Sequence, residues 1–279
     1  MIPASDVAAR FDKISEVYDE TREPLTPGAV DRVVAFLAKE GAETLLEVGV
    51  GTGRIAAPLV ERNVDIVGVD LSRKMLERAK MKGVAKLVMA DANQLPFVDG
   101  SFDAVLMAHV LHLLENPGGT VEKVARMARK ELVIIFRRRD GLPHGFDGDR
   151  REIWQAFRQA AEEAGYPLPS PSDGYVSRFR REAEFLEGFP PDEVIVVQDL
   201  DVVTTLGERL TVFEKRAYGF PMYIPDEVFQ KVVARLRATV DLTKEVRYRR
   251  VEQLGVWHRE RLMQMERTWN GRPPSSVPK

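Results

Sequence analysis

Short apolar runs alternate with helix-patterned segments along the first half of the chain. The runs are nearly continuous in apolar residues, as expected of strands that are covered on both faces of a parallel sheet. They lie at residues 44–48, 65–70, 86–91, 102–108 and 131–136. This alternation of strands and helices predicts a doubly wound α/β sheet.

Helix-starting and helix-ending residues stand between these runs. Thr26 and Pro27 form a predicted N-cap followed by proline at the first helical position, and Gly41 is placed to end that helix. Ser72 is a second predicted N-cap. Helices are therefore predicted at residues 5–18, 26–40, 55–62, 72–82 and 119–129.

The pattern changes after Arg137, where helical segments become more frequent. Two further strands are predicted, at residues 193–198 and 247–257, the second with polar and apolar residues roughly alternating. The stretch between them is longer than a hairpin needs and is predicted to be a helical insertion. Helices are predicted at residues 150–164, 179–186, 208–218 and 226–239.

Composition narrows the class of protein. The chain has 279 residues, a net charge of −2 and no cysteine, which excludes disulfides, thiolate metal sites and cysteine nucleophiles. The net charge gives no global reason to expect a nucleic-acid partner. The sequence shows no metal-binding motif, no membrane-spanning run and no signal core, so we expect a cytoplasmic protein without a metal.

A glycine-rich turn follows the first predicted strand. Gly49, Gly51 and Gly53 stand at alternate positions, and glycine allows both positive φ and close approach of a ligand to the backbone. The turn satisfies a relaxed dinucleotide-binding pattern, with Asp70 about 20 residues further on. On these features alone, a nicotinamide oxidoreductase fits as well as any other nucleoside-binding protein.

Carboxylates at the strand ends favour a different ligand. Glu47 stands just before the glycines, where an acidic group is unfavourable for a pyrophosphate but suits a ligand with cationic character. Asp70 and Asp91 end the next two strands, so three carboxylates are delivered to one edge of the sheet. His109 and His112 follow the end of the fourth strand.

Three stretches resemble the class I S-adenosylmethionine-dependent methyltransferases, and most closely the ubiquinone/menaquinone-biosynthesis group, methyltransferase type 11. Residues 47–53 match the acidic residue and three glycines of that family, and residues 69–76 match its acidic-ended second strand. Residues 90–114 match its adenine-binding strand and the stretch that follows. The resemblance covers roughly residues 8–136. It implies a Rossmann-like, seven-stranded, mainly parallel sheet whose last strand is antiparallel, with a helical lid or insertion.

The resemblance also implies a domain organisation. Residues 1–139 would hold the N-terminal helix and the cofactor-binding core, and residues 140–192 a helical lid segment. Residues 193–260 would complete the sheet, with the helical insertion at about 201–244, and residues 261–279 would form a tail. The insertion, the N-terminal helix and residues 150–174 are predicted to make a lid, which would exclude water and set the choice of acceptor.

The implied cofactor is S-adenosylmethionine, with S-adenosylhomocysteine as the product. Asp70 would bind the ribose hydroxyls, and Asp91 with the backbone at Ala92 would hold the adenine edge. Tyr18 and Arg22 would cover the methionyl end. The full set of expected cofactor residues is Tyr18, Arg22, Glu47, Gly49, Gly51, Gly53, Asp70, Leu71, Met75, Asp91, Ala92, Asn93 and Ala108.

The expected function is transfer of a methyl group to a small organic acceptor at oxygen, carbon or nitrogen. His109 and His112 are candidate general bases. Arginine clusters at residues 137–139, 178–181 and 247–250 leave open an RNA (tRNA) methyltransferase, although solvated surface charge explains them better. A non-catalytic S-adenosylmethionine-binding protein is the other alternative. A homodimer is left open.

Overall fold

The structure is a computed structural model that describes residues 4–137, 150–167, 175–217 and 224–268. A seven-stranded sheet with the order β3-β2-β1-β4-β5-β7-β6 forms its centre. β7 is antiparallel to both of its neighbours, β5 and β6, whereas β1 to β5 are parallel, so the predicted mainly parallel sheet with an antiparallel last strand is confirmed. The strands are β1 Thr44–Val48, β2 Asp65–Asp70, β3 Lys86–Met89, β4 Phe102–Ala108, β5 Ala128–Arg137, β6 Glu193–Thr205 and β7 Glu245–His258.

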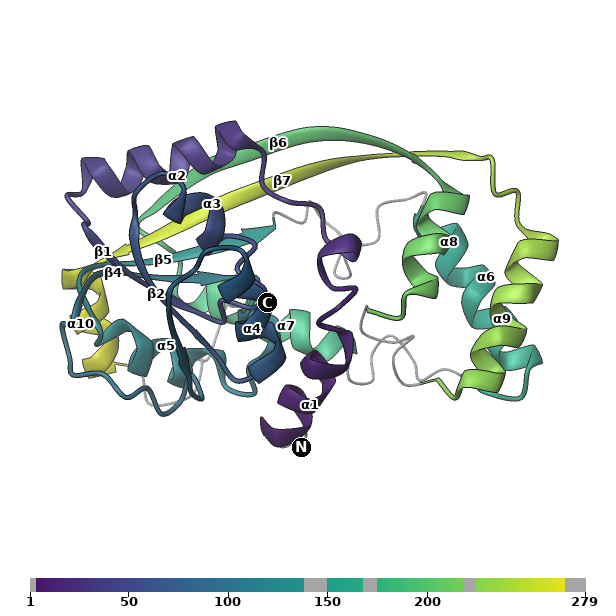
Figure 1. Cartoon of the computed structure of the whole chain (residues 1–279), viewed down its shortest axis with the longest axis horizontal. Coiled ribbons are helices and arrows are strands. Elements are labelled where there is room, and N and C mark those ends of the chain that lie inside the picture. Colours follow the sequence, from purple (N-terminus) through teal and green to yellow (C-terminus); the bar gives the residue numbers. More distant parts are fainter. Residues whose placement is uncertain (1–3, 138–149, 168–174, 218–223, 269–279) are drawn as a thin grey trace, which may run out of the picture.

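Helices cover both faces of the sheet (Figure 1). Their bounds are α1 Ala4–Ile14, α2 Pro27–Lys39, α3 Ala56–Val60, α4 Arg73–Met81, α5 Pro117–Ala125, α6 Arg150–Glu163, α7 Tyr175–Gly188, α8 Leu206–Glu214, α9 Asp226–Thr239 and α10 Arg259–Thr268, with 3-10 turns η1 Asp19–Thr21 and η2 Leu111–Leu113. The two predicted N-caps are confirmed, because Thr26 accepts from the Ala29 backbone and Ser72 from the Met75 backbone. In the described part of the chain, no helix is both long and apolar enough to cross a membrane.

Two apolar cores lie on opposite faces of the sheet. Residues of α2, α3 and α4 pack against one face, where Val33 and Leu59 are almost fully buried. Residues of α5, α7 and α10 pack against the other, around Trp257 of β7. The Trp257 side chain is completely buried, donates its indole N–H to the Phe189 carbonyl at 3.2 Å, and stacks on the Phe189 ring. The double coverage explains why the strand sequences are apolar on both faces.

The sixth strand is much longer than the sequence analysis predicted. It does not end at Gln198 but continues to Thr205, because residues 199–205 keep pairing with β7. Arg249 of β7 adds a bidentate ion pair to Asp199 of β6, at 2.5 and 2.7 Å. The helical insertion therefore begins at Leu206, not at about residue 201.

The long strands β6 and β7 carry a separate group of helices at their far end (Figure 1). α6, α8 and α9 pack around their own apolar core, which includes Phe157, Leu210 and Phe229. We call these three helices the distal helices. α1 lies between them and the sheet in this view.

Other boundaries also differ from the sequence analysis. The helix predicted at residues 119–129 is α5, which starts at Pro117 because Asn116 accepts from the Gly119 backbone. It ends earlier than predicted, because β5 already begins at Ala128. The predicted tail from residue 261 starts within α10, and residues 269–279 lie outside the described part of the chain.

Candidate cofactor and active site

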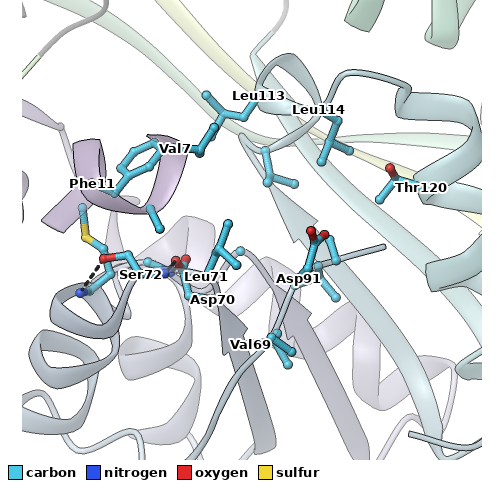
Figure 2. Close-up of a pocket in the computed structure, with 18 of the residues that line it drawn as sticks. Val7, Phe11, Val69, Asp70, Leu71, Ser72, Asp91, Leu113, Leu114 and Thr120 are labelled. Carbon is cyan, nitrogen blue, oxygen red and sulfur yellow. Dashed lines mark hydrogen bonds between the residues drawn. The ribbon is translucent and has the colours of Figure 1, made fainter. Parts of the chain in front are cut away.

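A cavity of about 600 Å³ lies at the carboxyl ends of β1, β2 and β4. This is the edge of an open parallel sheet at which ligands bind. α1 forms one wall, and Figure 2 shows its Val7 and Phe11 across from Leu71 and Asp70. Most of the lining side chains are apolar, and the volume is in the range of small-molecule sites.

The three glycines of the turn have different roles. Gly51, at φ +55°, lines the cavity, and a Cβ added to it would meet no other atom within 4 Å. Its backbone is therefore open to a ligand. Gly49 also lines the cavity, but its Cβ would come within 2.9 Å of Val110. Gly53 does not line it, because it packs against Ala79 of α4, where a Cβ would sit at 3.2 Å.

Asp70 joins the glycine turn to the next helix. Its Oδ2 accepts from the Gly51 backbone N–H at 2.8 Å, and its Oδ1 accepts from the Ser72 backbone N–H at 2.9 Å. Burial raises the pKa of this carboxyl, although the backbone hydrogen bonds oppose that effect. The carboxylate is held at the cavity wall in a fixed orientation (Figure 2).

Asp91 forms the opposite side of the cavity. It follows the end of β3, and its Oδ1 accepts from both the backbone and the side-chain nitrogen of Asn93, at 2.8 and 3.0 Å. The Thr120 hydroxyl of α5 in turn donates to Asn93 at 2.8 Å. A ligand that extends from Asp70 to Asp91 would therefore pass the carboxyl ends of β2 and β3.

Most of the predicted cofactor residues meet in this cavity. Those that line it are Tyr18, Gly49, Gly51, Asp70, Leu71, Met75, Asp91, Ala92, Asn93 and Ala108. Arg22, Glu47 and Gly53 are outside its lining. The Arg22 guanidinium lies over the Tyr18 ring at 4.7 Å and donates to the Ala217 carbonyl at 3.0 Å.

Of the two candidate bases, only His109 lines the cavity. Its Nε2 lies 3.4 Å from Oε2 of Glu252 on β7. Burial lowers the pKa of His109 well below its usual value, and the nearby Arg54 and Arg137 charges lower it further, so the imidazole is neutral at pH 7. His112 instead faces α7, with Nδ1 at 3.5 Å from Oε2 of Glu182.

Glu47 is a buried carboxyl beneath the glycine turn. Its side chain is 1% exposed, and its Oε2 has no hydrogen-bond partner among the described residues. Burial raises the pKa of Glu47 to about 8, although the Arg54 charge opposes this. Glu47 was predicted to act as an acidic group, but at pH 7 this carboxyl is largely protonated.

We expect Glu47→Gln to change how stability depends on pH. Between pH 4.5 and 8, wild-type Glu47 is ionised when unfolded but protonated when folded, so its contribution to the free energy of unfolding falls as pH rises. From pH 5 to pH 8, wild type should lose at least about 1.4 kcal/mol more than the variant, since each pKa unit contributes that amount. Urea unfolding at both pH values measures the difference.

The exposed Glu43, four residues earlier, provides the control. Glu43→Gln should leave the pH dependence of wild type unchanged, because that side chain is hydrated in both states. Parallel pH curves for wild type and Glu47→Gln would contradict a raised pKa.

A buried ion network lies behind His109 and was not predicted from the sequence. Arg250 was placed with the surface arginines, yet its side chain is only 3% exposed. It donates to Glu23 at 2.6 Å, and the Tyr248 hydroxyl donates to the same carboxylate at 2.6 Å. The sequence of β7 does indicate that these polar side chains lie together. Tyr248, Arg250 and Glu252 stand at every second position and therefore share a face of the strand.

Arg54 was also missed, although it directly follows the glycine turn. Its Nη1 donates to the Glu23 backbone carbonyl at 2.9 Å. Burial lowers the pKa of this guanidinium, and neighbouring Arg22 and Arg137 lower it further. Nothing in the local pattern at residues 51–54 indicates that burial, since it depends on the segment before α2.

The residues present fit S-adenosylmethionine. The open Gly51 backbone and the oriented Asp70 carboxylate suit a ribose, and the apolar side chains around Met75 and Leu113 suit a flat base. Glu47 lies outside the cavity lining and is largely protonated at pH 7, so it does not discriminate between a cationic ligand and a pyrophosphate. In the described part of the chain, no group of three His, Asp or Glu side chains is arranged to hold a metal ion.

The sequence is similar to those of known proteins. The family described as "Methyltransferase domain" matches residues 46–136. A demethylmenaquinone methyltransferase of Renibacterium salmoninarum is 31% identical over 202 residues, covering 71% of this chain and 83% of that protein. An uncharacterized protein of Methanocaldococcus jannaschii is 35% identical over 129 residues, which are 45% of this chain and 59% of that protein.

The length of the match varies among relatives. This chain spans only 59% of the Methanocaldococcus protein, whereas it spans most of the Renibacterium enzyme. A solved structure from Bacillus halodurans, described as a "putative methyltransferase", has a TM-score of 0.46 at 18% identity, covering 82% of this chain and 97% of that one. With its sheet order, its cavity and the long match to a methyltransferase, the chain belongs to the class I S-adenosylmethionine-dependent methyltransferases, in the methyltransferase type 11 group.

Proposed function

We propose that the protein transfers a methyl group from S-adenosylmethionine to a small organic acceptor at oxygen, carbon or nitrogen. One observation carries the proposal. A single cavity brings together the open Gly51 backbone, the carboxylates Asp70 and Asp91, and the neutral imidazole of His109. The first three are suited to the nucleoside, and His109 lies where an acceptor would approach.

The chain's contribution would be mainly to position the two reactants. S-adenosylmethionine supplies a methyl group on a sulfonium, and displacement in line is favoured when donor and acceptor are held together, by on the order of 7–11 kcal/mol in favourable cases. Asp70 and Asp91 would orient the nucleoside, and Tyr18 with α1 would exclude water above it. We also propose that Arg22 binds the methionyl carboxylate after leaving the Ala217 carbonyl.

The distal helices and α1 are proposed to act together as the lid that selects the acceptor. α1 lines the cavity itself, and Arg22 already joins η1 to Ala217, just after α8. Lys215 also forms an ion pair with Glu20, so two contacts connect these parts. The proposed location is the cytoplasm, and both a monomer and a homodimer fit the proposal.

The arginine cluster at residues 247–250 gives little support to the alternative of an RNA methyltransferase. Arg247 pairs with Glu245 and Arg249 with Asp199, so both exposed arginines of the 247–250 cluster have carboxylate partners. Arg250 is buried. Phosphate binding along this cluster would therefore have to break existing ion pairs.

Calorimetry tests the proposal directly. We expect S-adenosylhomocysteine to bind with one site per chain, and NADH not to bind. Purified protein should then release S-adenosylhomocysteine from S-adenosylmethionine when a panel of small phenols, quinols and amines is supplied, but not with tRNA. Binding of NADH without either sulfur cofactor would overturn the assignment. Tight cofactor binding without turnover of any acceptor would favour the non-catalytic alternative.

A further inference from the structure

Among the histidines that the structure describes, His109 alone lines the cavity, and Glu252 lies directly behind it, although the two residues are far apart in the sequence. We propose that Glu252 positions the His109 imidazole, so that its Nδ1 removes a proton from the methyl acceptor. This inference rests on the proposed function and specifies the acceptor class for the same site. The acceptor atom must carry a proton that it loses in the reaction, as a hydroxyl, an amine or an acidic C–H group does.

The backbone fixes where His109 points. It follows β4 directly and has φ +55°, in the left-handed region that a non-glycine residue seldom adopts. Its backbone N–H donates to the Ile135 carbonyl of β5 at 3.0 Å, which holds this conformation. Such strain is retained where the surroundings over-determine it, and it is common at functional sites.

The Glu252 carboxylate is arranged to take one more hydrogen bond. It is 2% exposed, and its Oε1 accepts from Nε and Nη2 of Arg137 at 3.1 and 2.9 Å. The Arg250 Nε lies 3.4 Å from the same oxygen. Oε2 is buried and has no hydrogen-bond partner among the described residues, and its ion-pair neighbour there is Nε2 of His109 at 3.4 Å.

A small closing movement would turn this contact into a hydrogen bond. Catalytic hydrogen bonds are often long before the ligands are in place and shorten in the complex. If Nε2 of His109 carries the proton and donates it to Glu252, the lone pair is on Nδ1, at the other side of the ring. The carboxylate thus selects the tautomer, as the third member of a nucleophile–base–carboxylate arrangement does.

Burial and the surrounding positive charges keep the His109 ring neutral, which is the form that can accept a proton. The titratable groups that act on it are Arg54, Arg137, Arg250, His112 and Glu252. The three guanidiniums and burial keep the pKa of His109 low, so the ring is neutral and can accept a proton. Glu252 is the carboxylate that then stabilises the imidazolium.

The acceptor's O–H, N–H or C–H bond breaks and its proton moves to Nδ1 of His109. The acceptor's electron pair forms the new bond to the methyl carbon, while the carbon–sulfur bond breaks and its pair stays on the sulfur, which becomes a neutral thioether. The proton on His109 passes to water after the products leave. No oxidant or reductant is needed.

The tautomer can be measured without an acceptor. The chain has four histidines, so nitrogen–proton correlation spectra of the whole protein with S-adenosylhomocysteine can be assigned residue by residue. We expect one neutral tautomer for His109, with the proton on Nε2. In Glu252→Gln the single tautomer should be lost and the apparent pKa of His109 should fall further, while the affinity for S-adenosylhomocysteine stays within about threefold.

A second ion pair supplies the matched control. Glu131→Gln removes the carboxylate that lies 2.7 Å from Nδ1 of His258, at the other end of β7. That variant should change the His258 signals and leave those of His109 as in wild type. A proton on Nδ1 of His109 in wild type, or an unchanged tautomer in Glu252→Gln, would overturn the inference.

Kinetics separate positioning from a structural role. With an acceptor identified in the panel, Glu252→Gln should lower kcat by about 10- to 100-fold with little change in KM, as is typical when a group that orients a histidine is removed. The wild-type rate should fall at low pH because His109 becomes protonated. The pH at which the rate falls should shift in Glu252→Gln. An unshifted pH profile would reject the role of Glu252. Failure to bind S-adenosylhomocysteine would reject the proposed function. The tautomer of His109 would still test whether Glu252 positions that ring.

Discussion

Asp70→Ala is expected to weaken the binding of S-adenosylhomocysteine by roughly 100-fold. Asp70 lines the cavity, and we expect its carboxylate to accept hydrogen bonds from both ribose hydroxyls; bonds to a charged group contribute about 1.5–3 kcal/mol each. A loss of about 3 kcal/mol corresponds to that factor in Kd. The variant also removes the acceptor for the Gly51 and Ser72 backbone N–H groups, so the turn is expected to loosen.

Asp65, at the start of β2, provides the control for Asp70, which ends the same strand. Asp65 is half-exposed and pairs with Lys86 at 2.6 Å, so Asp65→Ala should leave cofactor affinity within about twofold of wild type. Asp70→Asn, which keeps one carbonyl acceptor, should lie between wild type and Asp70→Ala. Titration calorimetry at fixed pH measures all three. Equal affinity in wild type and Asp70→Ala would remove Asp70 from the cofactor site.

Trp257→Ala is expected to destabilise the fold by about 3–5 kcal/mol, the usual range for removing a large buried aromatic side chain. The indole is completely buried between α7, α10 and the sheet, and its N–H is satisfied by the Phe189 carbonyl. Its ring also contacts Phe185, with centroids 6.2 Å apart. Truncation leaves a cavity and removes the donor to that carbonyl.

Urea unfolding of three variants tests this prediction. Trp257→Phe keeps most of the volume and should be less harmful than Trp257→Ala. Val194→Ala changes a side chain that is 48% exposed on β6 of the same sheet, and should shift stability by no more than about 0.5 kcal/mol. A loss below about 1 kcal/mol in Trp257→Ala would show that α7 and α10 close over the gap.

The sequence predicted best where local signals and the fold agree. Thr26 with Pro27 marked the start of α2, and the apolar run at residues 102–108 coincides with β4. The cofactor residues were predicted through a family motif, and most of them do line one cavity. The start of α2 and the bounds of β4 were predicted correctly because each depends on residues that are close together in the chain.

The misses depend on distant partners. Residues 199–205 look like the start of an insertion, and become strand because β7 pairs with them. Arg250 looks like surface charge, and is buried because Glu23 reaches it from the segment before α2. Glu252 became a candidate only when the sheet order placed β7 next to β5. No pattern over a few neighbouring residues contains such information.

The long hairpin of β6 and β7 also joins two parts of the molecule that have separate apolar cores. One end of it pairs with β5 in the central sheet, and the other end carries helices with an apolar core of their own. Residues 206–244 can therefore diverge, or be exchanged for another helical segment, without altering β1, β2 or the glycine turn. Under the proposed function, changes at this distal end would alter the choice of acceptor while the methyl donor is kept.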